Sequence, residues 1–173
     1  SESNGGRTLL ASDEFFAPIE NLLKPGRGEF ISDKYTDRGK WMDGWESRRK
    51  RTAGHDWCIL RLGKPGVIKE LDIDTNHFVG NFPSHASVDA CQVPPFTALG
   101  EIMNEVKWTE ILSRVELQGD SQNQFAIHDE ESFTHLRLNI YPDGGVARFR
   151  VYGHPEDSAD DSSSFTDAAA SEN

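Results

Sequence analysis

The stretch HLRLNIYPDGGVARFRVYG, residues 135–153, decides the fold class. Leu136, Leu138 and Ile140 alternate with polar residues before a Pro-Asp-Gly-Gly turn, and apolar residues alternate with arginines after it. A period of two places alternate side chains on opposite faces of a strand, and a turn of this composition joins neighbouring strands. The stretch therefore predicts a β-hairpin with one apolar face.

Further strand patterns precede this hairpin. Residues 56–63 are almost continuously apolar, whereas residues 66–75 and 85–93 alternate between apolar and polar. In the second run, Leu71 and Ile73 fall on the face expected to join the core, and carboxylates fall on the opposite face. Several short strands without β-α-β alternation predict an all-β fold, an antiparallel β-sandwich or jelly roll.

Two short helices are expected among the strands. The first follows Ser12 and stops at Pro25, with Pro18 limiting it to one or two turns. The second covers residues 98–106 and passes into a strand at 106–112, where β-branched and aromatic residues appear.

One folded domain is expected between two flexible ends. A chain of 173 residues with 36% hydrophobic residues is long enough to bury a core. Its last 18 residues contain six acidic residues and no Lys or Arg, and they offer too little apolar surface to offset the entropy of ordering them. We expect a flexible N-terminus at 1–7, a folded domain at 8–155 and a disordered acidic tail at 156–173.

Charge and composition exclude several classes of protein. A net charge of −11 argues against nucleic acid or an anionic membrane as the main partner. The chain has no run of 18 apolar residues and no signal-peptide pattern at its start, so we expect a cytoplasmic protein. Cys58 and Cys91 lie in strand-like runs and are too few for a disulfide framework, so we expect free thiols.

The segment WMDGWESRRKR, residues 41–51, is the first candidate site. It combines Trp45 and Glu46 with Arg48 and Arg49, and a guanidinium fork can bind the carboxylate of a small ligand through two hydrogen bonds. The same composition fits a solvated basic loop with tryptophans anchored in the core, or a nuclear localisation signal. Residue types alone leave these interpretations open.

The segment LDIDTNHFVGNFP, residues 71–83, is the second candidate site. Asp72 and Asp74 share one strand face, and a carboxylate pair near a histidine can supply a general acid and a general base. The same residues could form half of a Mn²⁺, Zn²⁺ or Ca²⁺ site, or simply the acidic solvent face of an edge strand. The polar candidates that follow the pair are Thr75, His77 and Asn81.

The order of four motifs closely resembles the allantoicase family from about Thr8 to Gly153. The motifs are SDEFFAPIENLLKPGRGEF, GKWMDGWESRRKR, HDWCILRLGKPGVIKELDIDTNHFVGNFPSHASVDAC and HLRLNIYPDGGVARFRVYG. The resemblance implies a galactose-binding-like jelly roll and hydrolysis of allantoate to ureidoglycolate and urea, a step of allantoin degradation in purine metabolism. Family members usually carry two such repeats, and this chain has one followed by a low-complexity segment. It is expected to be either an N-terminal portion or a form without the second repeat.

The chemistry of allantoate suggests roles for the candidate residues. The substrate carries one carboxylate and two ureido groups, so an enzyme must hold the carboxylate, release urea and direct water to the central carbon. The catalytic candidates are Glu46, Asp72, Asp74 and His77. The substrate-binding candidates are Trp45, Arg48, Arg49, Thr75 and Asn81.

Several points stay open in this interpretation. No cofactor is certain, and a divalent metal ion remains an option. A homo-oligomer that binds allantoate, and neither nucleic acid nor membrane, is expected. The alternative function is a non-catalytic jelly-roll module that binds a small molecule or carbohydrate, with tryptophans as stacking surfaces, or an incomplete and inactive fragment of the enzyme.

Overall fold

The computed structural model describes residues 5–156. Residues 1–4 and 157–173 fall outside this range, and with them most of the expected acidic tail. In chain order the elements are β1 (Arg7–Ala11), the 3₁₀ helix η2 (Ile19–Leu23), β2 (Tyr35–Thr36), β3 (Gly39–Lys40), β4 (Trp45–Glu46), β5 (Asp56–Asp74), β6 (His85–Cys91), α1 (Leu99–Asn104), β7 (Thr109–Glu116), β8 (Gln122–Ala126), β9 (Ser132–Tyr141), β10 (Gly145–Val146) and β11 (Arg148–Pro155).

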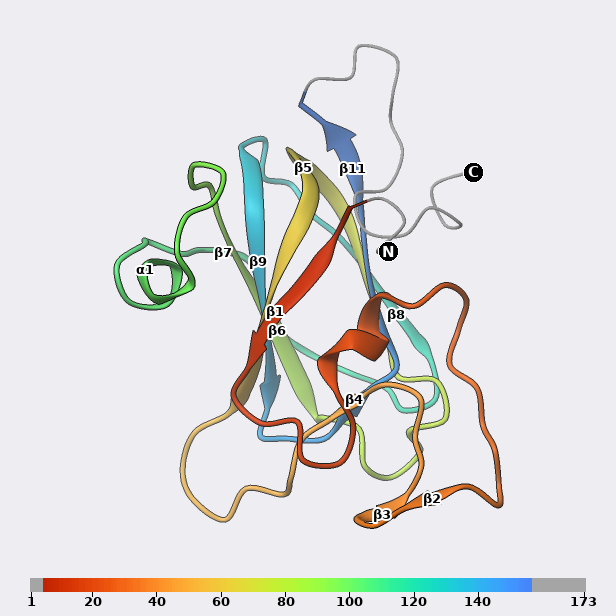
Figure 1. Cartoon of the computed structure of the whole chain (residues 1–173). Coiled ribbons are helices and arrows are strands. Elements are labelled where there is room, and N and C mark those ends of the chain that lie inside the picture. Colours follow the sequence, from red (N-terminus) through yellow and green to blue (C-terminus); the bar gives the residue numbers. More distant parts are fainter. Residues whose placement is uncertain (1–4, 157–173) are drawn as a thin grey trace.

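Strand β5 organises the fold (Figure 1). Seven strands form one continuous sheet that folds along β5 into two layers. The first half of β5 lies in the order β1-β5-β9-β6-β7, here called the first sheet, and its second half pairs with β11 on one side and β8 on the other, here called the second sheet. The pairing register with β9 shifts between Arg61 and Gly66, where the strand passes from one sheet to the other. The two strands expected at 56–63 and 66–75 are therefore one bent strand. All these pairings are antiparallel, which confirms the predicted all-β sandwich.

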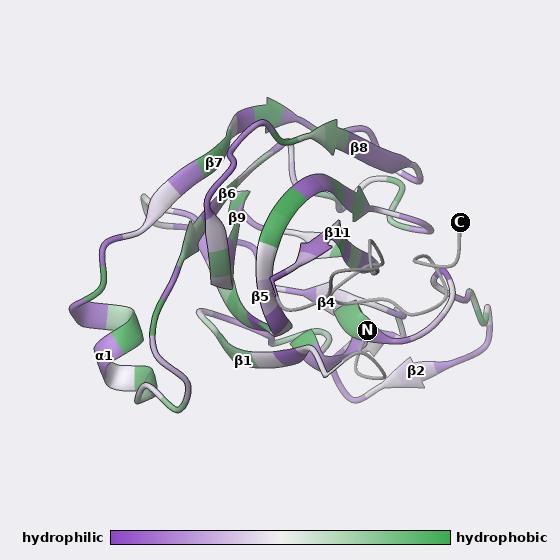
Figure 2. Ribbon diagram, turned by 90° about the horizontal axis from the view of Figure 1, so that it is seen from above, coloured by the Kyte–Doolittle hydropathy of each residue, from purple (hydrophilic) through white to green (hydrophobic). Residues whose placement is uncertain are grey.

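The core lies between the two sheets. Leu60, Val88 and Leu138 from the first sheet and Ile73 and Phe149 from the second have no exposed surface. Figure 2 shows hydrophobic segments on β5 and on neighbouring strands of the ring that surrounds this core. The alternation seen in the sequence thus predicts which side chains point inward.

The hairpin predicted for residues 135–153 is not formed. Strand β9 pairs with β5 and β6, whereas β11 pairs with β5 alone, so the two strands do not pair with each other. Residues 145–146 form β10, which pairs with β4. Two strands that bury their apolar faces in one core from opposite sides have the same alternation as a hairpin, so the pattern could not distinguish the two arrangements.

The helical segments are short and cover little of the sheets. Pro18 precedes η2, a five-residue 3₁₀ helix, and α1 is a six-residue helix next to β7. The predicted order of a helix and then a strand in residues 98–112 is confirmed, although the strand begins at Thr109. Within residues 5–156, no helix is long and apolar enough to cross a membrane.

Candidate functional site

A cluster of ionic side chains lies on the outer face of the second sheet. Arg148 lies opposite Asp74 and Arg150 lies opposite Asp72 across β11 and β5, and Gln122 of β8 lies on the other side of Asp74. One interpretation made this the acidic solvent face of an edge strand, but Asp72 and Asp74 are only 1% and 2% exposed. The carboxylates therefore need partners from the protein itself.

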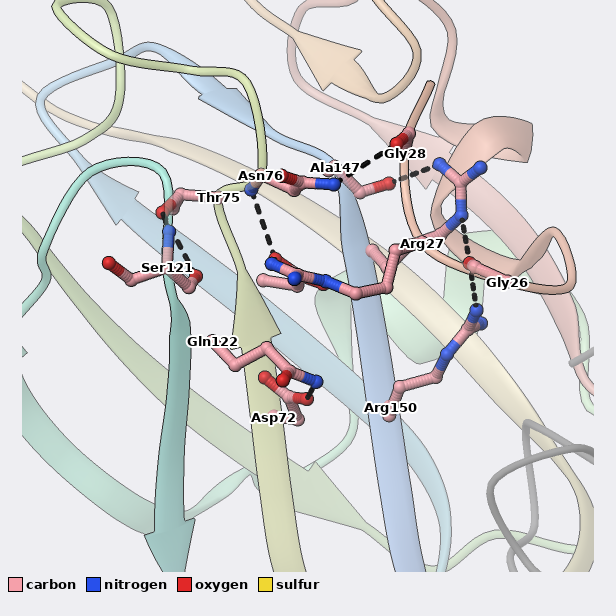
Figure 3. Close-up of polar contacts among 12 residues, drawn as sticks. Gly26, Arg27, Gly28, Asp72, Thr75, Asn76, Ser121, Gln122, Ala147 and Arg150 are labelled. Carbon is pink, nitrogen blue, oxygen red and sulfur yellow. Dashed lines mark hydrogen bonds and ion pairs between the residues drawn. The ribbon is translucent and has the colours of Figure 1, made fainter. Parts of the chain in front are cut away.

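The loop after η2 covers this cluster and supplies those partners (Figure 3). Arg27 donates hydrogen bonds from Nε and Nη2 to the two carboxylate oxygens of Asp74, at 2.8 and 2.9 Å. The carbonyl oxygen of Gly26 accepts hydrogen bonds from Arg148 Nε at 3.0 Å and from Arg150 Nη2 at 2.7 Å. Backbone carbonyls thus replace water around the arginines, and the loop closes the cluster.

Asp43 ties the first candidate segment to this cluster. Its Oδ2 accepts hydrogen bonds from Arg148 Nη2 at 2.8 Å and from the backbone N–H of Glu29 at 3.0 Å. Burial would raise the pKa of Asp43, but these two hydrogen bonds, together with the charges of Arg148 and Lys24, lower the pKa below the usual value. Asp43 and Arg148 therefore form a buried, charged anchor between the loop and β11.

Asp72 differs from Asp43 and Asp74. Their carboxylates accept hydrogen bonds from arginines, whereas the carboxylate of Asp72 accepts one from an amide. Gln122 Nε2 donates to Oδ2 at 2.9 Å, while Oδ1 is buried and accepts no hydrogen bond from residues 5–156. Burial and the nearby charge of Asp74 raise the pKa of Asp72 to about 6, against the opposing effect of Gln122, Gln124 and Arg150. Asp72 is thus the carboxyl of this cluster whose protonation changes close to neutral pH.

Asp72→Asn should alter how stability depends on pH. The pKa of Asp72 is higher in the folded chain than its usual value of 3.8, so its contribution to stability is full below about pH 4 and is lost as the pH rises through 6. Asn stays neutral, so the variant should gain roughly 2 kcal/mol relative to the parent between pH 4 and pH 7. Guanidinium chloride unfolding at both pH values measures this gain, with exposed Asp37→Asn as the control. If the unfolding free energies of parent and variant differ by the same amount at both pH values, the titration assigned to Asp72 is contradicted.

A side-chain hydrogen bond links the two candidate segments. Asn81 Nδ2 donates a hydrogen bond to Glu46 Oε2 at 2.8 Å. Burial raises the pKa of Glu46, and the hydrogen bond from Asn81 acts in the opposite direction. His77 makes other contacts, since its backbone N–H donates to Asp120 and its ring lies 5.6 Å from the ring of Phe30.

Two of the expected substrate-binding residues are enclosed in the protein. Trp45 has no exposed surface, and its Nε1 donates to the carbonyl of Asp13 at 2.8 Å. The hydroxyl of Thr75, also without exposed surface, donates to the carbonyl of Gln118 at 2.6 Å. Trp45 therefore offers no face for ligand stacking, contrary to the expectation for a binding module.

The two arginines of the first segment lie at the surface. The Arg48 guanidinium lies 4.2 Å from the centre of the Phe15 ring, and its Nε is 3.7 Å from a carboxylate oxygen of Asp13. Arg49 is exposed. Arg48 thus helps to hold the loop against the segment before η2.

An open pocket that the candidate segments do not include lies on the outer face of the first sheet. Its volume is about 330 Å³. Its lining is polar and aromatic and comes from the end of the 47–55 loop and from β5, β6, β7 and β9. The lining residues are His55, Trp57, Ser87, Asp89, Glu110, Arg137, Asn139 and Tyr141.

Hydrogen bonds fix the floor of this pocket. Asp89 Oδ2 accepts from Arg137 Nε at 3.0 Å, from Arg137 Nη2 at 2.8 Å and from Asn139 Nδ2 at 2.9 Å. Asn139 Oδ1 bonds to His55 Nε2 at 3.1 Å, which makes the imidazole the donor. Asn139 and Ser87 are almost fully buried, so the floor is preorganised rather than solvated.

Aromatic rings line one end of the pocket. The rings of His55 and Tyr141 lie 4.6 Å apart, and the hydroxyls of Tyr141 and Ser87 are 2.9 Å apart. The Arg114 guanidinium lies 3.8 Å from the centre of the Tyr141 ring. A small ligand in the pocket would therefore meet cationic, aromatic and carboxylate groups within one cavity.

A signal for this pocket was present in the sequence. The alternation that assigned Leu138 to the core also placed Arg137, Asn139 and Tyr141 together on the opposite face. Local alternation does not show that Ser87 and Asp89 join that face, because they come from another strand. In the described part of the chain, no group of three or more His, Cys, Asp or Glu side chains is arranged to hold a metal ion.

Comparison with known proteins assigns the family. The family model described as the allantoicase repeat matches residues 1–156. "Probable allantoicase 1" of Burkholderia mallei is 54% identical over 152 residues, which cover 88% of this chain and 44% of the relative. "Probable allantoicase" of Photobacterium profundum is 55% identical over 151 residues, with 87% and 44% covered. The chain spans less than half the length of these relatives.

Solved structures agree with this assignment. The crystal structure of allantoicase from Saccharomyces cerevisiae matches with a TM-score of 0.69 and 35% identity, over 86% of this chain and 40% of that one. A family 32 carbohydrate-binding module from C. perfringens matches with a TM-score of 0.56 and 12% identity, over 87% and 94% of the two chains. The second likeness shows the fold alone, and it confirms the predicted galactose-binding-like jelly roll. The chain belongs to the allantoicase family and comprises one allantoicase repeat.

Proposed function

We propose that this chain hydrolyses allantoate to ureidoglycolate and urea. The observation that carries the proposal is the family match across residues 1–156, which includes every residue of the outer-face pocket. Because the chain spans less than half of its curated relatives, activity of a single repeat is itself part of the proposal. Association into a homo-oligomer and a cytoplasmic location stay predictions.

The reaction sets the requirements for the site. Water forms a new C–O bond at the central carbon, one C–N bond breaks, and the released nitrogen takes a proton and leaves as urea. A site must hold the substrate carboxylate, bind the ureido groups and move one proton from water to the leaving nitrogen. These tasks need a cation, hydrogen-bond acceptors and at least one group that accepts and returns a proton.

The outer-face pocket supports these tasks better than the closed ionic cluster. Arg137 keeps Nη1, which forms no hydrogen bond with the described residues, and Arg114, which is not a lining residue, stacks on the Tyr141 ring that lines the pocket. Among the lining residues of the pocket, His55, Glu110 and Tyr141 are the titratable groups without an ion pair to a described residue, and the Tyr141 hydroxyl is already bonded to Ser87. We therefore assign substrate binding to this pocket and proton transfer to His55 and Glu110.

The contact between Glu46 and Asn81, here called the loop end, is a second proposed location for the same reaction. Glu46 is half-buried with a raised pKa and a hydrogen bond from Asn81, which suits a general acid. In that proposal the other catalytic groups would be those expected from the sequence, namely Asp72, Asp74 and His77.

Urea release tests the proposed function. The purified chain, incubated with allantoate with and without added divalent metal ions, should release urea in proportion to time and protein concentration. Release by a protein-free sample is the control. A folded chain that binds allantoate but never releases urea would be a non-catalytic binding module or an inactive portion of the enzyme.

A further inference from the structure

A second open pocket, here called the α1 pocket, lies between the first sheet, the 92–98 segment and α1. Its volume is about 860 Å³, and Figure 2 shows α1 standing outside the ring of strands. Small-molecule sites are usually concave and largely apolar, with a few polar groups that orient the ligand. The lining of the α1 pocket fits this description, since most of it is apolar, chiefly Leu9, Leu62, Val93, Pro94, Leu99 and Ile102.

His135 is a nearly buried polar side chain in this apolar lining. It is 5% exposed and lines the α1 pocket. Its Nδ1 lies 2.8 Å from Thr134 Oγ1, whereas its Nε2 forms no hydrogen bond with residues 5–156. Because a polar atom withdrawn from water costs free energy unless it finds a partner, Nε2 is a suitable contact for a polar group of a ligand.

The surroundings of Thr134 define which ring nitrogen of His135 carries the proton. Thr134 Oγ1 donates its single hydrogen to the carbonyl of Cys91 at 3.2 Å and accepts from the backbone N–H of Val93 at 3.1 Å. Nδ1 of His135 must then donate to Oγ1, because the hydroxyl has no second hydrogen to give. Burial and the charge of Arg61 lower the pKa of His135 to about 4, so the ring is neutral at pH 7. Nε2 therefore presents a lone pair, and its partner must be a hydrogen-bond donor.

Arg61 is the second polar group that a ligand would meet. It lies directly opposite His135 across β5 and β9, so the two side chains share one face of the sheet and are close neighbours. Within residues 5–156, its guanidinium forms no hydrogen bond and no ion pair, and its side chain is exposed. A ligand carboxylate can therefore bind the guanidinium fork without displacing a described partner.

The other polar residues of the lining are neutral or already engaged. Among the lining residues that the structure describes, Glu156 is the one acid, and its Oε2 accepts a hydrogen bond from Ser132 Oγ at 2.7 Å. The hydroxyl of Thr97 donates to a backbone carbonyl at 2.6 Å, and Gln92 adds an exposed neutral amide. The groups left to orient a ligand are thus chiefly the cation of Arg61 and the acceptor nitrogen of His135.

An exposed aromatic ring lies beside these two groups. Phe96 lines the α1 pocket and is 96% exposed. An aromatic side chain gains contact area, and a favourable ring geometry, when another ring binds next to it. This favours a ligand with an aromatic body over one with an aliphatic chain.

We propose that the α1 pocket binds a small aromatic carboxylic acid that carries a hydroxyl or N–H donor on its ring. The carboxylate pairs with Arg61, the ring lies against the apolar lining and Phe96, and the donor bonds to His135 Nε2. The α1 pocket shares no lining residue with the outer-face pocket or with the loop end. The proposal therefore does not depend on the hydrolysis of allantoate.

Three related compounds test the proposal. Para-hydroxyphenylacetate carries both polar groups, phenylacetate lacks the hydroxyl, and para-cresol lacks the carboxylate. Titration calorimetry with the intact chain at pH 7 should give roughly tenfold tighter binding of para-hydroxyphenylacetate than of either other compound, because each of those loses one polar contact.

Substitutions assign the two contacts separately. Arg61→Gln should bind para-hydroxyphenylacetate roughly tenfold more weakly and leave the affinity for para-cresol unchanged. Arg51→Gln, at an exposed arginine outside both pockets, should bind all three compounds as the parent does. His135→Phe keeps a ring but lacks Nε2, so it should bind phenylacetate and para-hydroxyphenylacetate equally. Unfolding midpoints show whether each variant is folded, and the parent with Arg61→Gln decides the question if His135→Phe is not.

Absence of binding, equal affinities of the parent for the three compounds, or parental affinities in Arg61→Gln would overturn the proposal. Concentration-dependent association of the chain that Phe96→Ser abolishes, without binding of any compound, would assign the pocket to a second copy of the chain instead. None of the compounds is allantoate, so the urea assay and this titration succeed or fail independently.

Discussion

Replacing Arg148 with Met is expected to lower the free energy of unfolding by about 3–5 kcal/mol. Arg148 is 2% exposed and donates to the carboxylate of Asp43, which is 6% exposed. Removing the guanidinium leaves that carboxylate buried without its main partner, because Lys24 is 3.8 Å away and half-exposed. Guanidinium chloride unfolding monitored by tryptophan fluorescence measures the loss.

The double variant Arg148→Met with Asp43→Leu separates the charge from the packing. With both charges removed, no buried ion is left uncompensated, so a large part of the lost stability should return. Arg148→Lys serves as a second comparison, since it keeps the charge but loses the fork that also bonds to backbone carbonyls. If the unfolding free energy of Arg148→Met alone stays within about 1 kcal/mol of the parent, as for ordinary surface substitutions, the anchor role is contradicted.

His55→Gln is expected to reduce kcat/KM for allantoate by roughly a hundredfold or more. Gln can still donate a hydrogen bond to Asn139, as His55 does, but it cannot accept and return a proton. The floor of the pocket should therefore persist while proton transfer is lost. Initial rates of urea release, with unfolding midpoints measured alongside, check the prediction.

Glu46→Gln is the matched comparison because it changes the acid of the other proposed location. Gln keeps a partner for Asn81, so the loop end should remain folded. If allantoate reacts in the outer-face pocket, this variant should stay within about threefold of the parent. A large loss in Glu46→Gln with full activity in His55→Gln would move the active site to the loop end.

The sequence predicted the strands of this fold better than their connections. Alternation assigned the inward residues of β9 and β11 correctly, because the period of two depends only on local burial. Pairing partners depend on long-range contacts, and both strands pair with β5 rather than with each other. The single bent β5 was hidden for the same reason, since Gly63 and Pro65 resemble a turn that ends a strand.

The candidate site was harder to predict for a related reason. Asp74 was a catalytic candidate, with the solvent face of an edge strand as an alternative, but Arg27, 47 residues earlier, covers it. Asp43 and Arg148 are 105 residues apart and meet in a buried pair. Local composition shows which residues carry charge, but only the fold decides which of them are enclosed and which face a cavity.

Localising bound allantoate is the most direct test of the central claim that the repeat acts through its outer-face pocket. Indole N–H signals of the ¹⁵N-labelled chain, assigned by single Trp→Phe substitutions, report separately on the pocket through Trp57 and on the buried loop end through Trp45. On addition of allantoate at low temperature, the Trp57 signal should shift progressively while the Trp45 signal stays in place. A shift of Trp45 with an unchanged Trp57 signal would contradict the account.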